Sequence, residues 1–344
     1  MATLVYVGCG SVKGDVVIFS LDPGTGALTR TGCAEAGGST SFSALHPSGK
    51  YLYLTRNRSH HVAAFARDAT TGGLTMLNLV AAAGVDPGIG ANPAYLTVDR
   101  SGKFLLAANY SGHSVNVFPI LPDGKLADLV CTHSAGKNAH SIRLDPGNQF
   151  AFVPYLGSDL VAQYRFDETS GQLTPNRPAA VAVGAGEGPR HFDFHPNGKW
   201  VYLLTELGCS IYAFNLDAAE GSWAQFQHVS TVPAGYTGRK WAGDIHVAPS
   251  GKFLYASNRA HESLVGFAIG PYDGRLTLVE HVPSGGKTPR NFTLTPDGRF
   301  LFVANQDEDN LVTFAVDTAT GKLTKIATLA DLCTSPYFVR VVQL

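Results

Sequence analysis

A short turn motif, Pro-x-Gly-Lys or a close variant of it, recurs six times along this chain of 344 residues. Its anchor position is occupied by Gly49, Gly102, Asn148, Gly198, Gly251 and Gly298. Neighbouring anchors are 46 to 53 residues apart. Proline presets φ for a tight turn, and glycine or asparagine accepts the positive φ that the turn needs. A period of this length indicates a repeat architecture, in which each unit adds its own part of the core.

Each repeat carries the pattern of four short strands. An alternating strand precedes the turn, and a second strand follows it, as in residues 51–54. A third strand, such as 311–316, leads through a hairpin signal at 317–323 into a fourth. The composition agrees, because 15% charged residues, 38 glycines and 19 prolines suit many short strands joined by tight turns. Four strands in about fifty residues describe one blade of a β-propeller.

The two ends of the chain complete each other. Residues 4–28 match the second and third strands of a repeat without a first, and residues 335–342 look like a first strand with nothing after it. Together they form one more blade, and their pairing closes the ring and removes open strand edges. We therefore predict an all-β fold, a single seven-bladed β-propeller domain spanning 1–344, with four antiparallel strands per blade. A solenoid is the alternative, but it requires capping repeats.

Bulk properties exclude several classes of partner. The net charge of -1 offers no basic field for nucleic acid or an anionic membrane. We see neither an apolar run long enough for a membrane span nor a secretory signal, and we expect a cytoplasmic protein, a monomer or weak homodimer. The chain has five scattered cysteines without C-x-x-C spacing, and we expect buried or free thiols rather than a disulfide set. They are Cys9, Cys33, Cys131, Cys209 and Cys333.

The loops divide into a stereotyped set and a variable set. If the strands of a blade are named A to D from the channel outward, the A–B and C–D turns repeat the same motifs, whereas the D–A and B–C loops differ between blades. Function on a scaffold usually lies in variable loops. The residues at the start of the A strands are Ser41, Ala94, His140, Arg190, Gly243, Arg290 and Tyr337. Those at one B–C loop position include Asn57, Tyr110, Glu206, Arg259 and Gln306.

Both positions lie at the same mouth of the channel, so His140, Arg190, Glu206, Arg259 and Arg290 are predicted to converge there. Arginine presents a planar fork to carboxylate or phosphate, which favours a small anionic ligand. The alternative is that these side chains tie the blades together through buried polar contacts. Further polar residues expected to bind substrate near this mouth are Lys137, Asn138, His191, Asp244, His246, Asn258, Lys287, Arg290 and Asn305.

Several stretches around these residues resemble one known family. They are residues 138–143, 186–192, 205–207, 257–259, 288–292 and 304–306. The sequence is similar in them to the lactonase family of seven-bladed β-propellers, which includes propeller-type 6-phosphogluconolactonases and the carboxy-cis,cis-muconate cyclase. The resemblance implies an active site of one histidine, two arginines and a glutamate, which fall here on His140, Arg190, Arg259 and Glu206. The chain departs from the family pattern at Thr205, where an asparagine is common, and at 242–245, where an Ala-Glu-Ile type of sequence is usual.

The resemblance implies hydrolysis of a sugar-acid lactone, without a cofactor. We expect Glu206 to act as general base, Arg190 and Arg259 to stabilise the oxyanion, and His140, near its pKa at neutral pH, to protonate the ring oxygen. Lys137, Lys287 or Arg290 would bind a phosphate or a second carboxylate.

Three other functions stay open. The alternating string 191–195 could bind zinc, but we prefer metal-free chemistry, because histidines in such strings more often hydrogen-bond neighbouring blades and the mouth has few carboxylates. The same site could also run as a lactonising cyclase or isomerase. Finally, the chain could be a noncatalytic propeller that binds a partner.

Overall fold

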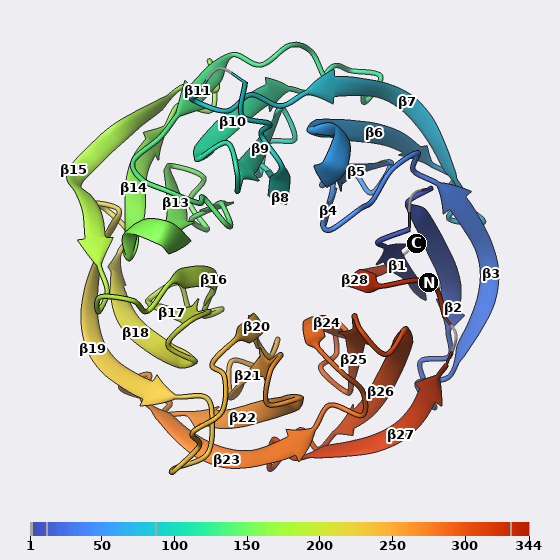
Figure 1. Ribbon diagram of the computed structural model, residues 1–344, viewed down its shortest axis with the longest axis vertical. Helices are drawn as coiled ribbons and strands as arrows, with labels where there is room; N and C mark the ends of the chain where they lie inside the picture. Colours follow the sequence, from blue (N-terminus) through green and yellow to red (C-terminus); the bar gives the residue numbers. More distant parts are fainter. Residues whose placement is uncertain (1–2, 12, 87, 331, 344) are drawn as a thin grey trace.

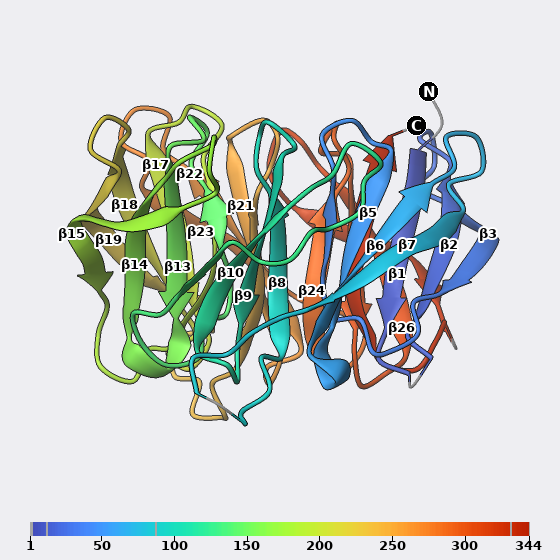
Figure 2. The ribbon, with the colours of Figure 1, turned by 90° about the horizontal axis from the view of Figure 1, so that it is seen from above.

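The computed structural model describes residues 3–11, 13–86, 88–330 and 332–343. Their strands form seven antiparallel sheets of four strands each, arranged as blades in a ring (Figure 1). This confirms the seven-bladed β-propeller predicted from the repeat. In Figure 2 the variable loops lie on the lower face, and the two chain ends lie on the upper face.

The strands of the blades, taken in chain order, have the following bounds. The blade that contains both chain ends consists of β28 (Pro336–Gln343), β1 (Thr3–Cys9), β2 (Asp15–Leu21) and β3 (Leu28–Glu35). The next three are β4 (Ser43–Leu45), β5 (Tyr51–Arg56), β6 (His61–Arg67) and β7 (Leu74–Ala81); β8 (Pro93–Val98), β9 (Phe104–Asn109), β10 (Ser114–Pro119) and β11 (Cys131–His133); and β12 (Arg143–Leu144), β13 (Phe150–Tyr155), β14 (Leu160–Phe166) and β15 (Leu173–Ala182). The last three are β16 (Pro189–Phe194), β17 (Trp200–Thr205), β18 (Ser210–Asp217) and β19 (Ser222–Ser230); β20 (Ala242–Val247), β21 (Phe253–Asn258), β22 (Ser263–Ile269) and β23 (Leu276–Pro283); and β24 (Pro289–Leu294), β25 (Phe300–Asn305), β26 (Asn310–Val316) and β27 (Leu323–Leu329). Two B–C loops form short 3-10 turns, η1 (Asn57–Ser59) and η2 (Leu156–Ser158).

The B strands are the most deeply buried. Every residue of β9, β13, β17, β21 and β25 is buried, because each B strand lies inside its blade and between two neighbouring blades. The outer D strands alternate or stay exposed, as β27 does. The hydrophobic core is therefore divided into clusters that join adjacent blades, such as the one in which Tyr202 and Leu204 pack with Ile245 and Leu254.

A recurring contact joins neighbouring blades, in which an aromatic residue of a B strand packs on a glycine in the C–D turn of the next blade. Trp200 at the start of β17 packs on Gly274 in the C–D turn of the following blade, where a Cβ would lie 2.5 Å from the indole. Two residues further along β17, the Tyr202 hydroxyl donates a hydrogen bond of 2.8 Å to the Gly274 carbonyl. Tyr255 bonds Gly321 in the same way, at 2.9 Å. The turn glycine is thus required by packing between blades as well as by its positive φ.

The ring closes where the ends of the chain meet. Strand β28 pairs antiparallel with β1, from Leu4 opposite Val342 to Gly8 opposite Phe338. This confirms the predicted role of the C-terminal strand.

The expectation of free thiols throughout is wrong at this closure. Cys9, at the end of β1, forms a disulfide with Cys333, in the segment that leads into β28. The two cysteines are 324 positions apart in sequence, so their spacing gave no sign of the pairing, and only the closed ring brings them together. Cys33, Cys131 and Cys209 are free. The cytoplasmic location stays a prediction, and the disulfide removes one reason for it.

Helices play almost no part in this fold. Among the described residues no helix is long and apolar enough to cross a membrane.

Candidate active site

A cavity of about 260 Å³ opens among the D–A and B–C loops. Its walls are formed by Asn57, Asn92, Ala94, Tyr110, His140, Glu206, Arg259 and Arg290. All of these except Asn92 occupy the two repeat positions that the sequence singled out. The blades therefore bring His140, Glu206, Arg259 and Arg290 together at one mouth of the channel, as predicted.

Glu206, the residue after β17, lies at the centre of a cluster of donors. One of its oxygens, Oε2, is 2.9 Å from Arg190 Nε and 2.7 Å from Arg259 Nη2. The other, Oε1, accepts a hydrogen bond of 3.0 Å from the indole of Trp241. Burial alone would raise the pKa of the Glu206 carboxyl, but the charges of Arg259 and Arg190 and the indole bond outweigh it, and the pKa falls below its ordinary value. Glu206 is therefore ionised at neutral pH.

The two arginines are held in place from several sides. Arg259 Nε donates to the Ala242 carbonyl at 2.8 Å, and the guanidinium stacks 3.8 Å above the ring of Trp241. Arg190 is only 2% exposed, and its Nη1 donates to the Gly243 carbonyl. Both carbonyls belong to the start of β20, so the A strand of one blade orients the arginines of the cluster.

His140 lies beside this cluster without joining it. Its Nε2 is 3.9 Å from Glu206 Oε2, which is beyond hydrogen-bond distance, and its ring meets Tyr110 edge to face. Burial, followed by the positive charge of Arg190, lowers the pKa of His140 well below its ordinary value. The expectation that His140 titrates near neutral pH is therefore wrong, and the imidazole is neutral there.

Arg290, the second residue of β24, lines the cavity from the blade next to that of Arg259. Its guanidinium lies 5.1 Å from the ring centre of Tyr337, and Nη1 is 3.5 Å from the side-chain oxygen of Gln306. Within the described part of the chain it forms no ion pair with a carboxylate. Burial, with the charge of Arg190, lowers the pKa of Arg290 to about 10, so that it still carries its proton at neutral pH.

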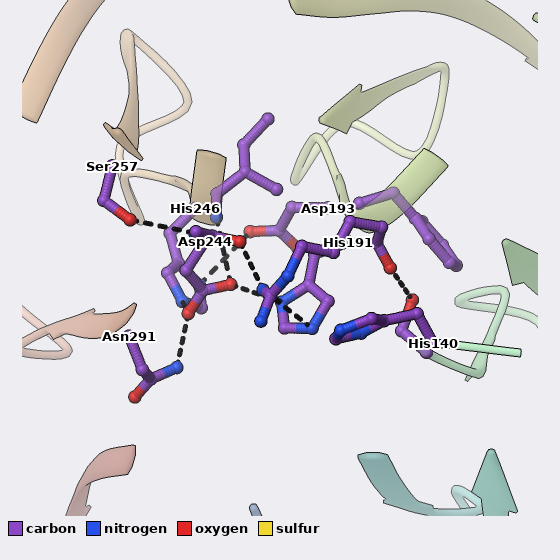
Figure 3. A network of polar contacts seen from close by, with 12 residues as sticks. His140, His191, Asp193, Asp244, His246, Ser257 and Asn291 are labelled. Carbon is purple, nitrogen blue, oxygen red and sulfur yellow. Dashed lines mark hydrogen bonds and ion pairs between the residues drawn. The ribbon is translucent and has the colours of Figure 1, made fainter. Parts of the chain in front are cut away.

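A second layer of polar side chains lies deeper in the channel than the cavity, and Figure 3 shows it. Asp244 accepts from His191 Nδ1 at 2.7 Å, from His246 Nε2 at 3.0 Å and from the side-chain amide of Asn291. The other ring nitrogen of His191 is 3.2 Å from Arg190 Nη1. Because Nδ1 donates to Asp244, Nε2 carries the lone pair that accepts from Arg190. The residues His191, Asp244 and His246, which were expected to bind substrate, do not line the active-site cavity. Instead, His191 contacts Arg190, and Asp244 and His246 hold His191 through hydrogen bonds to Asp244.

Charge and burial fix the protonation of this layer. Burial opposes ionisation of Asp244, but His246 and His191 outweigh it and hold the Asp244 pKa well below its ordinary value. Burial and then the charge of Arg190 lower the pKa of His191 to about 4. At neutral pH the layer therefore contains an ionised Asp244 and a neutral His191.

Asn258 and Asn305 belong to the scaffold, in contrast to the prediction that they bind substrate. Both end a B strand and are fully buried. Asn258 Nδ2 donates to the Thr231 carbonyl at 2.7 Å, and Asn305 Nδ2 donates to Asn310 at 2.8 Å. Asn258 thus connects the end of β21 to the loop that follows β19 of the preceding blade, Asn305 connects the end of β25 to the start of β26, and neither side chain lines the cavity.

Three further predicted residues also lie outside the cavity lining. Lys137 is exposed, and exposed Lys287 pairs with Glu308 at 3.2 Å. The Asn138 side chain donates to the Tyr110 carbonyl at 3.1 Å and supports that wall indirectly. All three lie in variable loops, as the sequence predicts, but a place in such a loop does not determine the direction of a side chain.

The alternating string 191–195 does not converge on one point. Asp193 accepts from Arg143 Nη1 at 2.6 Å, whereas the His195 ring contacts the carbonyl of Gly251 at 2.8 Å in the next blade. In the described ranges no three His, Cys, Asp or Glu side chains are grouped as a metal site.

Sequence reasoning missed Trp241 and Asn92. Each lies two residues before the first A-strand position, at the end of a D–A loop. This position recurs in every blade, as the A-strand and B–C loop positions do, and its regular spacing is the signal that identifies both residues.

Comparisons with known proteins agree with this site and fold. Residues 4–340 match the family model described as Lactonase, 7-bladed beta-propeller. The chain is 33% identical over 301 residues to the 6-phosphogluconolactonase of Bacillus subtilis (strain 168), with 83% of each chain covered. It is 33% identical over 269 residues to the 6-phosphogluconolactonase of Pectobacterium carotovorum, with 78% of each covered. The solved periplasmic gluconolactonase of Pseudomonas aeruginosa superposes with a TM-score of 0.92 at 29% identity, covering 100% of this chain and 99% of the other. The chain therefore belongs to the lactonase family of seven-bladed β-propellers.

Proposed function

We propose that the protein is a lactonase that hydrolyses a phosphorylated sugar-acid lactone of the 6-phosphogluconolactone type. The observation that carries the proposal is the arrangement in the cavity. A neutral imidazole faces an Arg–Glu–Arg cluster, and a further arginine without a carboxylate partner lines the same walls. Two relatives that are 33% identical to this chain over the aligned residues are named 6-phosphogluconolactonase, which supports the reaction class.

The geometry supports His140 rather than Glu206 as the general base, which reverses the roles expected from the sequence. Three donors engage the Glu206 carboxylate, from Arg190, Arg259 and Trp241, and hold it in place as an ionised group. The His140 imidazole is neutral and lines the cavity. Its Nδ1 is buried and lacks a hydrogen-bond partner among the described residues, which leaves Nε2 as the nitrogen for proton transfer.

The proposed reaction conserves all atoms and charges. Water attacks the lactone carbonyl carbon while His140 takes its proton, and the carbonyl electron pair moves to oxygen. Arg259 stabilises this oxyanion from the cavity wall. The bond to the ring oxygen then breaks, and the imidazolium of His140 returns the proton to that oxygen. Glu206, whose carboxylate is 3.9 Å from Nε2, stabilises the imidazolium while it exists.

Charge in the cavity supports a substrate with a strongly anionic group. Three arginines, Arg190, Arg259 and Arg290, face one carboxylate, that of Glu206. Arg190 and Arg259 form ion pairs with Glu206, whereas Arg290 forms no ion pair among the described residues and can bind an anion. A guanidinium binds phosphate in a planar, two-point fashion, and we assign the phosphate to Arg290.

The test is an assay of purified protein on δ-lactones of gluconate and of 6-phosphogluconate, with spontaneous hydrolysis subtracted. We expect enzymatic opening of both rings, with a higher kcat/KM for the phosphorylated one. Absence of turnover above the spontaneous rate on either lactone would refute the proposal. A carboxymuconate included in the same panel would reveal cyclase activity, and turnover of that compound alone would replace the lactonase proposal.

A further inference from the structure

A second cavity, of about 250 Å³, lies at the other end of the channel. We call it the far-mouth cavity, and it is lined by Phe42, Ala44, Leu45, Tyr95, Leu96, Thr97, Val98, Arg143, Asp193, His246 and Arg340. Arg143 and Arg340 stand three residues further along their A strands than His140 and Tyr337. Three residues of strand correspond to about 10 Å. The far-mouth cavity therefore opens toward the face on which the chain ends lie in Figure 2.

Aromatic and polar side chains separate the two cavities. Phe42, just before β4, stacks on Tyr95 of β8 in the neighbouring blade with ring centres 3.9 Å apart, and the His191 ring packs against Tyr95 at 5.2 Å. Asp244, which holds His191, completes this layer. These side chains lie between the far-mouth cavity and the lactonase site, and the same layer contains a small hollow of about 10 Å³ beside Phe42 and His191.

Arg340 supplies a half-buried guanidinium to the wall of the far-mouth cavity. Its Nε donates to Ser43 Oγ at 2.8 Å and its Nη2 donates to the Ser43 carbonyl, so the guanidinium is fixed in direction. It makes no ion pair with an acidic residue in the part of the chain that the structure describes. A fixed guanidinium on a cavity wall presents its remaining N–H groups to a ligand.

Among the residues that line the cavity, the other charged groups do not cancel the charge of Arg340. Arg143 Nη1 is 2.6 Å from Asp193 Oδ1, so these two charges compensate each other. His246 lies 3.0 Å from Asp244 and 3.9 Å from Asp193, and it can only add positive charge. Counted over the lining residues alone, the cavity wall carries one net positive charge, and the ionised Asp244 behind His246 offsets part of it, because its charge acts on both Arg340 and Arg143.

We propose that the far-mouth cavity is a second binding site, for a small oxyanion that Arg340 and Arg143 hold together. The ligand is a carboxylate or a phosphate no larger than a sugar acid, because the far-mouth cavity has nearly the same volume as the active-site cavity. The hydroxyl-bearing side chains of Tyr95 and Thr97 on the same walls suit an anion that also carries hydroxyl groups. This inference does not depend on the lactonase proposal, since it concerns a different cavity.

The competing explanation is that Arg340 serves only to join β28 to the neighbouring β4 through Ser43. Calorimetric titration distinguishes the two. Sodium gluconate and sodium phosphate, each against sodium chloride at equal ionic strength, are titrated into the Arg290→Gln protein, whose active-site anion binding is weakened. The same titrations are repeated with Arg290→Gln combined with Arg340→Gln, Arg340→Lys or Thr97→Phe.

We expect saturable binding of gluconate or phosphate to Arg290→Gln. The added Arg340→Gln change should weaken this binding by about tenfold or more, because a charge-assisted hydrogen bond is lost, whereas Arg340→Lys should retain part of it. Thr97→Phe fills the cavity without removing a charge and should also abolish binding, which covers the case in which Arg340→Gln fails to fold. Which of the two anions binds identifies the class of ligand.

Two results would overturn the inference. The first is the absence of saturable binding of both anions to Arg290→Gln. The second is binding that Arg340→Gln and Thr97→Phe leave unchanged. A single Arg340→Gln variant should keep lactone hydrolysis, so loss of the far-mouth site and failure of the lactonase proposal give different results.

Discussion

At the scale of single residues, burial and the charges of neighbouring arginines set the protonation states in the active site. Glu206 and His140 are only 3.9 Å apart, yet the pKa of each is lowered, and for different reasons. Arginine charge overcomes the burial of Glu206 and stabilises its ionised form, whereas burial and arginine charge act together to keep His140 neutral. A carboxylate and an uncharged base therefore coexist at neutral pH.

The pH profile follows from this state of His140. A base must be unprotonated, so activity is lost as pH falls through its pKa and is constant above it. Because the His140 pKa lies well below 6.5, kcat/KM should be flat from pH 7 down past pH 6.5 and fall only in more acidic solution. His140→Asn should reduce kcat by about 10²-fold or more and remove this acidic limb. An acidic limb centred at or above pH 6.5, or one that persists in His140→Asn, would contradict the assignment.

Arg290 decides between substrates if it binds the phosphate. Arg290→Gln should lower kcat/KM for the phosphorylated lactone by about 10- to 100-fold, the equivalent of one charge-assisted hydrogen bond, and should change the unphosphorylated lactone much less. Lys287→Gln is the matched control, because that lysine is exposed and paired with Glu308 outside the cavity. Equal losses on both lactones would instead place Arg290 at the reacting carbonyl.

At the scale of elements, the turn glycines act between blades. Gly274 and Gly198 have nearly the same backbone, with φ of 70° and 71°, but a Cβ on Gly198 meets nothing within 4 Å, whereas one on Gly274 meets Trp200. The two glycines therefore separate the cost of the backbone conformation from the cost of packing.

We expect Gly198→Ala to lower the free energy of unfolding by about 1–2 kcal/mol, which is the cost of a left-handed alanine. Gly274→Ala should cost about 1–3 kcal/mol more, because the indole of Trp200 must move. Urea denaturation of both variants measures the difference. Equal losses would show that the contact between turn and blade adds nothing to stability.

At the scale of the whole molecule, closure of the ring joins the two ends of the chain twice, through the β1–β28 pairing and through the Cys9–Cys333 disulfide. The disulfide constrains the unfolded chain over nearly its entire length, so its removal should matter. Cys9→Ser with Cys333→Ser should lower the free energy of unfolding by about 2–5 kcal/mol. Exposed Cys33→Ser serves as control and should change stability little. If reductant leaves the unfolding midpoint of the parent protein unchanged, the disulfide does not stabilise the ring.

The sequence by itself determined the number of blades, the closing strand and the cavity wall, since each depends on a regular register. Once every blade repeats one strand pattern, equivalent positions such as those of His140 and Arg290 must reach the same mouth. The contacts that depend on direction were decided only by the tertiary structure. Asn258 bonds the loop after β19 rather than a ligand in the cavity, Trp241 donates a hydrogen bond to Glu206, and Cys9 pairs with Cys333. Neighbouring blades set these side-chain directions and distances across the ring, and local spacing does not encode them. The protonation of His140 belongs to this second group, because burial and the arginines of other blades determine it.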